Sequence, residues 1–367
     1  MHSHYTYDLW DEQTFAAKQQ LWQQLLEKSD ADRLFLSWQW QYAWWKNCLC
    51  RKARLQIIAV YHKQQLVALA PLFSHEKRLK RLLSIRQLQF IGCSYDIPDA
   101  VRSDNLDFIL ERNADKRAID QVLHRAIRSL SWDNFLVQSI SRRAGAFRLL
   151  RRFQDNNRLE ILSRSINYIV DFSGDFKHFS KRLKKKIRQK TLLHRRLIAD
   201  QLELKAVGFQ DSEAFIRELN RLKVTRWNKP VYENQRLKFQ QMFTDLCRQS
   251  ENISLLSSMM LMDNKAQSAF FGFSCDNQGY FLQYAFDPAY NPKLSLGFLH
   301  LGYVIEQGYR QGLKQLQLLP GGGQSDPYKQ YLANKLQPQV TVRIISSPWL
   351  KALHWLFARL AARGKKA

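Results

Sequence analysis

The sequence predicts a two-domain protein of the α/β class with mixed sheets. Two observations lead to this prediction. Segments with strand-like and helix-like patterns alternate along most of the chain, and 367 residues with 45% hydrophobic content suit two hydrophobic cores better than one. We expect an N-terminal domain over residues 1–162, a C-terminal domain over residues 163–345, and a basic amphipathic tail over residues 346–367.

The N-terminal domain opens with a helical pattern over residues 12–28 and has a second one over residues 118–130. Strands are predicted at residues 55–61, 66–72, 88–92, 105–110 and 134–138. Between the first helix and the first strand, four tryptophans and a tyrosine crowd into positions 38–45. Such a cluster can stack bases, but aromatic side chains more often pack a core, and we expect packing here.

The C-terminal domain is organised around residues 279–319. An aromatic strand over residues 279–286 is followed by a polar loop with two prolines, a helix over residues 298–308 and a strand over residues 314–319. Strand, loop, helix and strand in this order form a βαβ unit, whose two strands lie parallel. Upstream we expect a strand at residues 165–171, helices at 215–226 and 239–247, and a hairpin over 254–273.

The loop of this βαβ unit places a lysine, a serine and a glycine at the start of the helix. The first N–H groups of a helix lack partners within it and lie at the positive end of its dipole, so they favour an anion. The loop therefore predicts a site for the phosphates of a cofactor, formed by Lys293, Ser295, Leu296, Gly297 and Phe298. A Ser-x-Gly sequence also serves simply to cap and pack a helix, so both interpretations stay open.

Four short segments, at residues 286–290 (Phe-Asp-Pro-Ala-Tyr), 295–297 (Ser-Leu-Gly), 308–312 and 327–329 (Pro-Tyr-Lys), carry a resemblance to a known family by their order and spacing. Together they resemble the GNAT acyltransferases and, more closely, the CelD-like bacterial acyltransferases, named for an association with cellulose biosynthesis. Residues 222, 226–227, 239 and 270–273 extend the resemblance, which covers residues 35–335. The common GNAT pattern Gln/Arg-x-x-Gly-x-Gly/Ala is incomplete here, because Gly297 is its only glycine.

The resemblance implies two tandem GNAT-like domains, the first one degenerate, and acetyl-CoA or another acyl-CoA as the donor. In GNAT-type catalysis an acceptor amine or hydroxyl attacks a thioester held between splayed strands, and an ionisable group helps the thiolate to leave. On this resemblance Tyr328 is a candidate general acid, and Lys329 is a candidate to neutralise phosphate or thiolate. Tyr284 and Asp326 are candidate general bases. Tyr328 and Lys329 serve equally well to fix a C-terminal helix.

The remaining candidates for ligand binding are few. Arg226, beside Trp227, is a candidate to bind an acidic group of the substrate, with a surface ion pair as the alternative. The five cysteines are scattered without a C-x-x-C motif, and no metal-ligand spacing, Ser-His-Asp order or P-loop is present. We therefore expect reduced thiols and no metal.

Positive charge is the strongest compositional feature. The formal net charge is +25, and nine of the sixteen residues over 181–196 are Lys or Arg, with none acidic. Because neighbouring like charges on a helix repel, an anionic partner is favoured over a merely solvated face. The partner can be the cofactor's phosphates, an acidic polymer such as tRNA or a polysaccharide, or an anionic membrane surface. The tail over residues 348–360 suits either a membrane interface or packing on the protein.

Neither a signal-peptide pattern nor an apolar run of eighteen residues is present, so we expect a cytoplasmic protein, with peripheral attachment to the inner face of the plasma membrane. The expected function is transfer of an acetyl or acyl group from acyl-CoA to an amine or hydroxyl of a cell-envelope or polysaccharide-related acceptor. One alternative is an aminoacyl-tRNA-dependent transferase of the Fem type, which shares the duplicated architecture. The other is a non-catalytic adaptor at an anionic membrane or a polysaccharide synthase.

Overall fold

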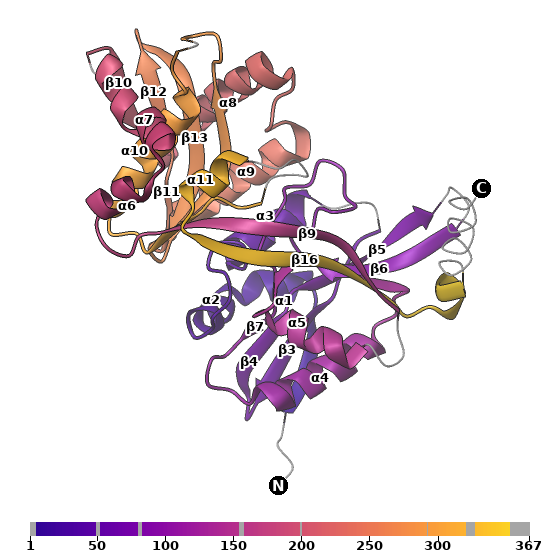
Figure 1. The fold of residues 1–367 in the computed structure, drawn as a ribbon. Coiled ribbons are helices and arrows are strands. Elements are labelled where there is room, and N and C mark those ends of the chain that lie inside the picture. The colour runs from indigo at the N-terminus through magenta and orange to yellow at the C-terminus, as the bar shows by residue number, and fades with distance from the viewer. Residues whose placement is uncertain are drawn as a thin grey trace, which may run out of the picture. The chain divides into compact units, whose positions relative to one another are not determined.

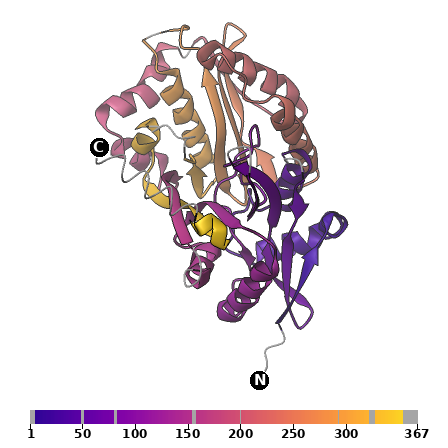
Figure 2. The same cartoon turned by 90° about the vertical axis from the view of Figure 1, so that its right-hand side faces the viewer.

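The chain forms two compact units in the computed structural model, which describes residues 5–48, 52–79, 83–153, 158–198, 200–291, 293–320 and 327–352 (Figures 1 and 2). Unit 1 contains Met1–Ser165 and Pro338–Ala367, and unit 2 contains Ile166–Gln337. The chain enters unit 2 within strand β9 (Arg158–Asp171) and leaves it within strand β16 (Lys335–Ile345). Unit 2 is thus inserted into the sequence of unit 1.

Unit 1 has one sheet with the strand order β1-β3-β4-β7 and a second run of strands in the order β16-β8-β6-β5-β2. Its strands are β1 (Tyr5–Trp10), β2 (Arg54–Leu55), β3 (Ile57–His62), β4 (Gln65–Ala70), β5 (Leu72–Leu79), β6 (Leu83–Phe90), β7 (Ile109–Leu110) and β8 (Asn134–Ser141). Its helices are α1 (Glu12–Ala17), α2 (Gln19–Glu27), α3 (Trp38–Asn47), α4 (Lys116–Ser129), α5 (Gly145–Leu150) and the 3₁₀ turn η1 (Arg151–Phe153).

The aromatic cluster of unit 1 forms helix α3 and is buried. Trp38, Trp40, Trp44 and Trp45 are each at most 5% exposed, and Trp44 and Trp45 both pack against Phe73 of β5. The prediction of packing rather than base stacking is confirmed. Strands β5 and β6 pair from Leu72–Phe90 to Leu79–Leu83, so they include basic residues outside the predicted strands.

Unit 2 has strands in the order β10-β12-β13-β14-β15-β9, and β11 also pairs with β13. Their bounds are β10 (Leu202–Ala206), β11 (Ile253–Leu255), β12 (Ser258–Met262), β13 (Lys265–Cys275), β14 (Gln278–Phe286) and β15 (Gln315–Gln317). The helices are α6 (Phe176–Arg182), α7 (Lys185–Thr191), α8 (Ser212–Trp227), α9 (Asn234–Arg248), α10 (Leu296–Arg310), α11 (Pro327–Leu332) and the 3₁₀ turns η2 (Leu193–Leu197) and η3 (Phe209–Asp211).

Helices cover both faces of the sheet in unit 2, with α8 on one face and α10 on the other (Figure 2). Adjacent residues of β13 point to opposite faces, so Phe271 packs against Phe215 of α8 while Phe270 packs near His300 of α10. The predicted βαβ unit is confirmed as β14–α10–β15, and its two strands are parallel. Unit 1 repeats this arrangement as β6–α4–β8, where β6 and β8 are also parallel.

The basic segment over residues 181–196 is divided among α6, α7 and η2 rather than forming one helix. The backbone is extended at Leu183 and Lys184, which separates α6 from α7. Phe179, Leu183 and Ile187, which recur near helical spacing in this part of the chain, are buried in the core of unit 2. No helix among the described residues is long and apolar enough to span a bilayer. Residues 353–367, which hold most of the predicted amphipathic tail, lie outside the described ranges.

Candidate active site

The two parallel strands of the βαβ unit in unit 2 pair for a short distance and then separate. They pair at three positions, from Gln278–Gln315 to Tyr280–Gln317, after which β14 continues to Phe286 while β15 ends. A bulge lies just beyond the last pair, because Leu282 has no counterpart on β13. A bulge bends its strand and re-aims the side chains that follow. The bulge therefore lies at the point where β14 and β15 cease to pair.

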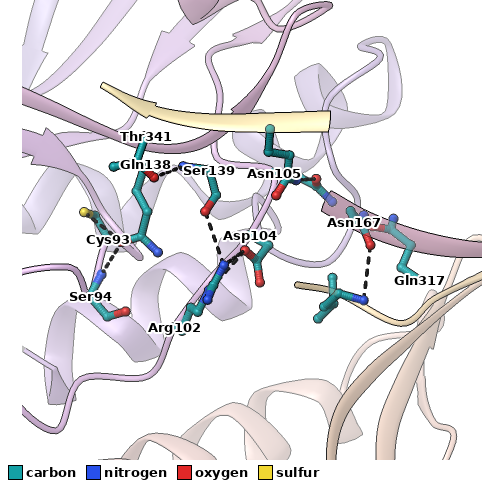
Figure 3. A network of polar contacts seen from close by, with 12 residues as sticks. Cys93, Ser94, Arg102, Asp104, Asn105, Gln138, Ser139, Asn167, Gln317 and Thr341 are labelled. Carbon is teal, nitrogen blue, oxygen red and sulfur yellow. Dashed lines mark hydrogen bonds and ion pairs between the residues drawn. The ribbon is translucent and has the colours of Figure 1, made fainter. Parts of the chain in front are cut away.

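The chain after β15 is held apart from β14 by unit 2's own side chains. Leu319 has a left-handed backbone with φ of +55°, a strained conformation for a bulky residue. Its N–H donates to Oδ1 of the buried Asn167 at 3.1 Å, and its carbonyl accepts from Nζ of Lys329 at 3.0 Å. Asn167 is fixed in turn, because it donates to Oε1 of Gln317 at 2.9 Å (Figure 3). These hydrogen bonds fix the backbone just after β15, at the point where β15 no longer pairs with β14.

The amino end of α10 lies at this opening and keeps its N–H groups available. The backbone N–H groups of Gly297 and Phe298, in the first turn, have no acceptor within the helix. The N-cap residue Ser295 does not supply one either, because its side chain makes no capping hydrogen bond. The equivalent helix of unit 1 differs. There the carboxylate of Asp115 caps α4 and accepts from the N–H groups of Arg117 and Ala118. Unit 1 thus places its own anion where unit 2 leaves room for one.

Tyr284 of β14 points its hydroxyl at the amino end of α10. A Cβ at position 297 would lie 2.9 Å from this hydroxyl, so only glycine allows so close an approach. The side chain is 8% exposed, and its hydroxyl makes no hydrogen bond of good geometry among the described residues. Burial raises the pKa of Tyr284 far above its ordinary value, although the nearby Ser268 hydroxyl acts to lower this pKa. The Tyr284 hydroxyl therefore keeps its proton and can donate a hydrogen bond.

An aromatic and cationic group borders the same position. The ring edge of Phe286 would lie 3.3 Å from a Cβ at position 297. The guanidinium of Arg226, from the last turn of α8, lies 4.2 Å from the centre of this ring and 4.3 Å from that of Trp227. Arg226 also acts electrostatically to lower the pKa of Tyr284, against the larger effect of burial. The structure thus brings together two regions that the sequence suggested separately.

A second cation approaches from α7. Nζ of Lys190 lies 5.7 Å from the ring centre of Phe298, in the first turn of α10. The ring of Tyr328 packs edge-on against the same phenylalanine, with 6.3 Å between centres. Lys190 belongs to the basic segment over residues 181–196, but the sequence did not distinguish it from its basic neighbours, because its position depends on the packing of α7 against α10. The two helices touch at Gly302, where a Cβ would lie 2.3 Å from the carbonyl oxygen of Thr191.

His300, which the sequence reasoning overlooked, lies one turn into α10 and is fully buried. Its Nε2 is 2.9 Å from the hydroxyl of Ser258, and its Nδ1 is 2.8 Å from the hydroxyl of Ser268. Burial lowers its pKa to about 3, so the imidazole is neutral and joins α10 to strands β12 and β13. Histidine at an apolar position of an amphipathic helix was the available signal, since Leu296 and Val304 flank it by one turn on the same buried face.

The remaining predicted residues occupy other positions. Lys293 is exposed on the loop before α10. Lys329 is 5% exposed, and its ammonium binds the Leu319 carbonyl rather than facing the amino end of α10. Asp326 lies outside the described residues. Within the described ranges, no group of three His, Cys, Asp or Glu side chains has the arrangement of a metal site.

Unit 1 fills the equivalent opening with its own side chains (Figure 3). Strands β6 and β8 last pair at Gln89 and Leu136. Just beyond, Oε1 of Gln138 on β8 accepts from Sγ of Cys93 at 3.2 Å and from N–H of Ser94 at 3.1 Å. This amide bridges the two strand ends where unit 2 has a gap.

Comparisons with known proteins agree with this geometry. Residues 181–330 match the family described as an acetyltransferase (GNAT) domain. FemX has a TM-score of 0.60 at 8% identity, over 91% of this chain and 98% of its own. A conserved protein of unknown function from Bacteroides thetaiotaomicron VPI-5482 has a TM-score of 0.52 at 10% identity, over 93% of this chain and 100% of its own.

The C-terminal domain (DUF2156) of a putative lysylphosphatidylglycerol synthetase from Agrobacterium fabrum has a TM-score of 0.51 at 12% identity, over 94% of this chain and 97% of its own. The sequence matches none of the curated proteins compared with it. At such low identities the structural similarities establish the fold alone. The predicted mixed α/β class with a GNAT fold is confirmed.

Proposed function

We propose that unit 2 transfers an acyl group from acyl-CoA to an amine or hydroxyl, at the opening between β14 and β15. The observation that carries this proposal is the buried, unpartnered hydroxyl of Tyr284, which faces the available N–H groups of α10. A buried hydroxyl without a partner costs about 1–3 kcal/mol. A ligand that accepts its hydrogen bond recovers this free energy.

The residues around the opening fit a phosphate-bearing thioester donor. The first-turn amides of α10 and the ammonium of Lys190 would hold phosphate oxygens. When bound, the donor supplies an acyl carbon that the acceptor nucleophile attacks, and the carbon–sulfur bond breaks as the new bond forms. Tyr284 holds its proton because of its raised pKa, and is placed to donate a hydrogen bond to the departing sulfur, which takes up the proton that the acceptor loses. Arg226 would attract an anionic group of the acceptor.

Tyr328 remains the candidate general acid, since it packs on Phe298 at the same opening. Lys329 has a positioning role instead, because its ammonium donates a hydrogen bond to the carbonyl of Leu319 and so holds the strained backbone there. The CelD-like resemblance adds a narrower proposal, that the acceptor belongs to the cell envelope or to a polysaccharide. Both N- and O-acylation are compatible with the proposed chemistry.

Calorimetric titration with acetyl-CoA and with longer acyl-CoAs tests the proposal. We expect saturable binding that weakens in Gly297→Val, because the added side chain meets Tyr284 and Phe286. Gly312→Ala is the matched control for loss of a glycine, since a Cβ there meets no atom within 4 Å, although its φ of +69° gives it some backbone strain. An absence of heat with every acyl-CoA, from a protein that melts cooperatively, would refute the proposal.

An aminoacyl-tRNA donor is the second candidate, favoured by the net charge of +25 together with a fold similar to that of FemX. Tight, saturable binding of charged tRNA without any acyl-CoA binding would favour this candidate. A non-catalytic adaptor would bind neither donor. The same titrations therefore separate the three functions.

A further inference from the structure

The basic segment of unit 2 carries three exposed lysines and two exposed leucines within residues 184–197. Leu193 and Leu197 of η2 are 49% and 67% exposed. Lys184, Lys185 and Lys186, at the start of α7, are all exposed, and no acidic residue lies in the first turn of that helix. We call these five residues the α7–η2 patch.

The apolar part of the patch is presented on a rigid support. Between the two leucines, Arg195 forms an ion pair with Glu306 of α10, and its guanidinium lies 3.8 Å from the ring centre of Tyr303. Ile198, just after η2, is buried. The turn is thus fastened to α10 through Arg195, while the side chains of Leu193 and Leu197 remain exposed. An exposed leucine on a fixed turn does not escape water by local rearrangement.

The cationic part of the patch lacks neutralising partners. The ion pairs near this region join Glu306 to Arg195 and to Arg310, and none joins Lys184, Lys185 or Lys186 to a carboxylate among the described residues. Within α7, Lys186 and Lys190 are also one turn apart, a spacing at which like charges destabilise a helix. An anionic surface would relieve this repulsion and would cover the leucines at the same time.

We propose that the α7–η2 patch docks unit 2 on the surface of an anionic lipid bilayer. Lysines attracted by lipid phosphates and leucines inserted at the boundary of the acyl chains are the two contributions that hold a peripheral protein on a membrane. Nucleic acid would use the lysines but would gain little from two aliphatic side chains, because base stacking requires aromatic or guanidinium groups. The combination of charges and leucines therefore favours lipid.

Vesicle flotation with the full chain tests this proposal. Vesicles of phosphatidylcholine with one third phosphatidylglycerol should bind the protein, and pure phosphatidylcholine vesicles should not. The triple change Lys184→Gln, Lys185→Gln, Lys186→Gln should weaken binding by about a hundredfold, since each cation near the surface contributes about fivefold. The double change Leu193→Ser, Leu197→Ser should weaken it by about tenfold or more.

Matched controls lie elsewhere on the chain. Leu336→Ser removes a leucine that is 58% exposed outside the patch, and Lys63→Gln, Lys116→Gln, Lys238→Gln removes three exposed lysines. Neither control should reduce binding beyond the small general effect of net charge. Equal binding to neutral vesicles, or unchanged binding of the leucine variant, would overturn the proposal. Binding to RNA of mixed sequence that depends on the lysines, without vesicle binding, would overturn it as well.

A second measurement guards against variants that lose their fold. Leu197→Trp introduces a fluorophore at the more exposed of the two leucines of the patch. Lipids brominated along the acyl chain should quench this additional emission in anionic vesicles, whereas the parent protein should show a smaller change. Equal quenching of variant and parent would place Leu197 away from the bilayer and would overturn insertion.

Discussion

Replacing Tyr284 by phenylalanine should stabilise the protein while weakening donor binding. The substitution keeps the ring, whose centre lies 6.1 Å from that of Phe281 and 5.5 Å from that of Phe286. It removes only a hydroxyl that is buried and unpartnered. Leaving such a group out of water costs about 1–3 kcal/mol, so its removal should raise the unfolding free energy by about 1 kcal/mol. For a unit of this size, the melting temperature should rise by about 2–4 °C.

Donor affinity should change in the opposite direction. A hydrogen bond from the Tyr284 hydroxyl to the donor contributes about 0.5–1.5 kcal/mol, so the dissociation constant for acetyl-CoA should rise by about two- to tenfold. Differential scanning calorimetry measures the first effect, and isothermal titration measures the second. Tyr232→Phe is the matched control, because Tyr232 is also buried in unit 2 but packs against Phe271 on the α8 side of the sheet. This control should leave donor affinity unchanged.

The two signs distinguish a binding role from a structural one. If the hydroxyl served only the fold, Tyr284→Phe would lower the melting temperature and leave the affinity for acetyl-CoA intact. That result would contradict the assignment of Tyr284 to the donor site. A rise in stability with unchanged affinity would keep the burial argument but remove the hydroxyl from contact with the donor.

Three further substitutions probe the surroundings of the site. Gly302→Ala should destabilise unit 2 by about 1–3 kcal/mol in urea unfolding, because its Cβ would lie 2.3 Å from the Thr191 carbonyl oxygen. Helix propensity alone would instead stabilise the variant by about 1 kcal/mol, and that result would contradict the contact. Folding lowers the pKa of His300 from 6.5 to about 3, so below pH 6.5 the unfolded chain takes up a proton that the folded chain excludes. Relative to His300→Gln, the unfolding free energy of the parent protein should therefore fall by about 1.4 kcal/mol per pH unit as the pH falls from 6.5 toward 3. If the unfolding free energies of the two proteins changed in parallel with pH, His300 would not be buried in its neutral form. Lys190→Gln should weaken acetyl-CoA binding by about tenfold in titration calorimetry, whereas Lys185→Gln, on the exposed side of α7, should not; equal effects would indicate general charge attraction instead.

The sequence predicted those parts of the fold whose signals are local. The order of strand, loop, helix and strand around α10 was readable because Gly and Pro mark its boundaries and its apolar residues recur at helical spacing. The hairpin of β12 and β13 was readable as well, since Asp263 and Asn264 adopt the left-handed conformations that a tight turn requires. Hydrophobic periodicity identified α4 and α8 within a few residues of their observed bounds.

Contacts between distant segments account for what the sequence did not predict. The opening between β14 and β15 depends on the bulge at Leu282 and on the strained turn at Leu319, and neither has a local signature. Lys190 reaches the site only because α7 packs on α10. The basic segment is divided into α6, α7 and η2 for the same reason, because tertiary contacts outweighed the helical preference of the local sequence.

The insertion of unit 2 within unit 1 constrains how the protein is made. Strand β16, which pairs with β8 from Gln339–Ser141 to Ile345–Asn134, is synthesised after the whole of unit 2. The two ends of unit 2 are joined within it, where Nδ2 of Asn167 donates to Oε1 of Gln337 at 3.3 Å. On the ribosome, unit 2 can therefore close as an autonomous body while the sheet of unit 1 still lacks a strand. We therefore expect unit 2 to complete its fold before unit 1 does.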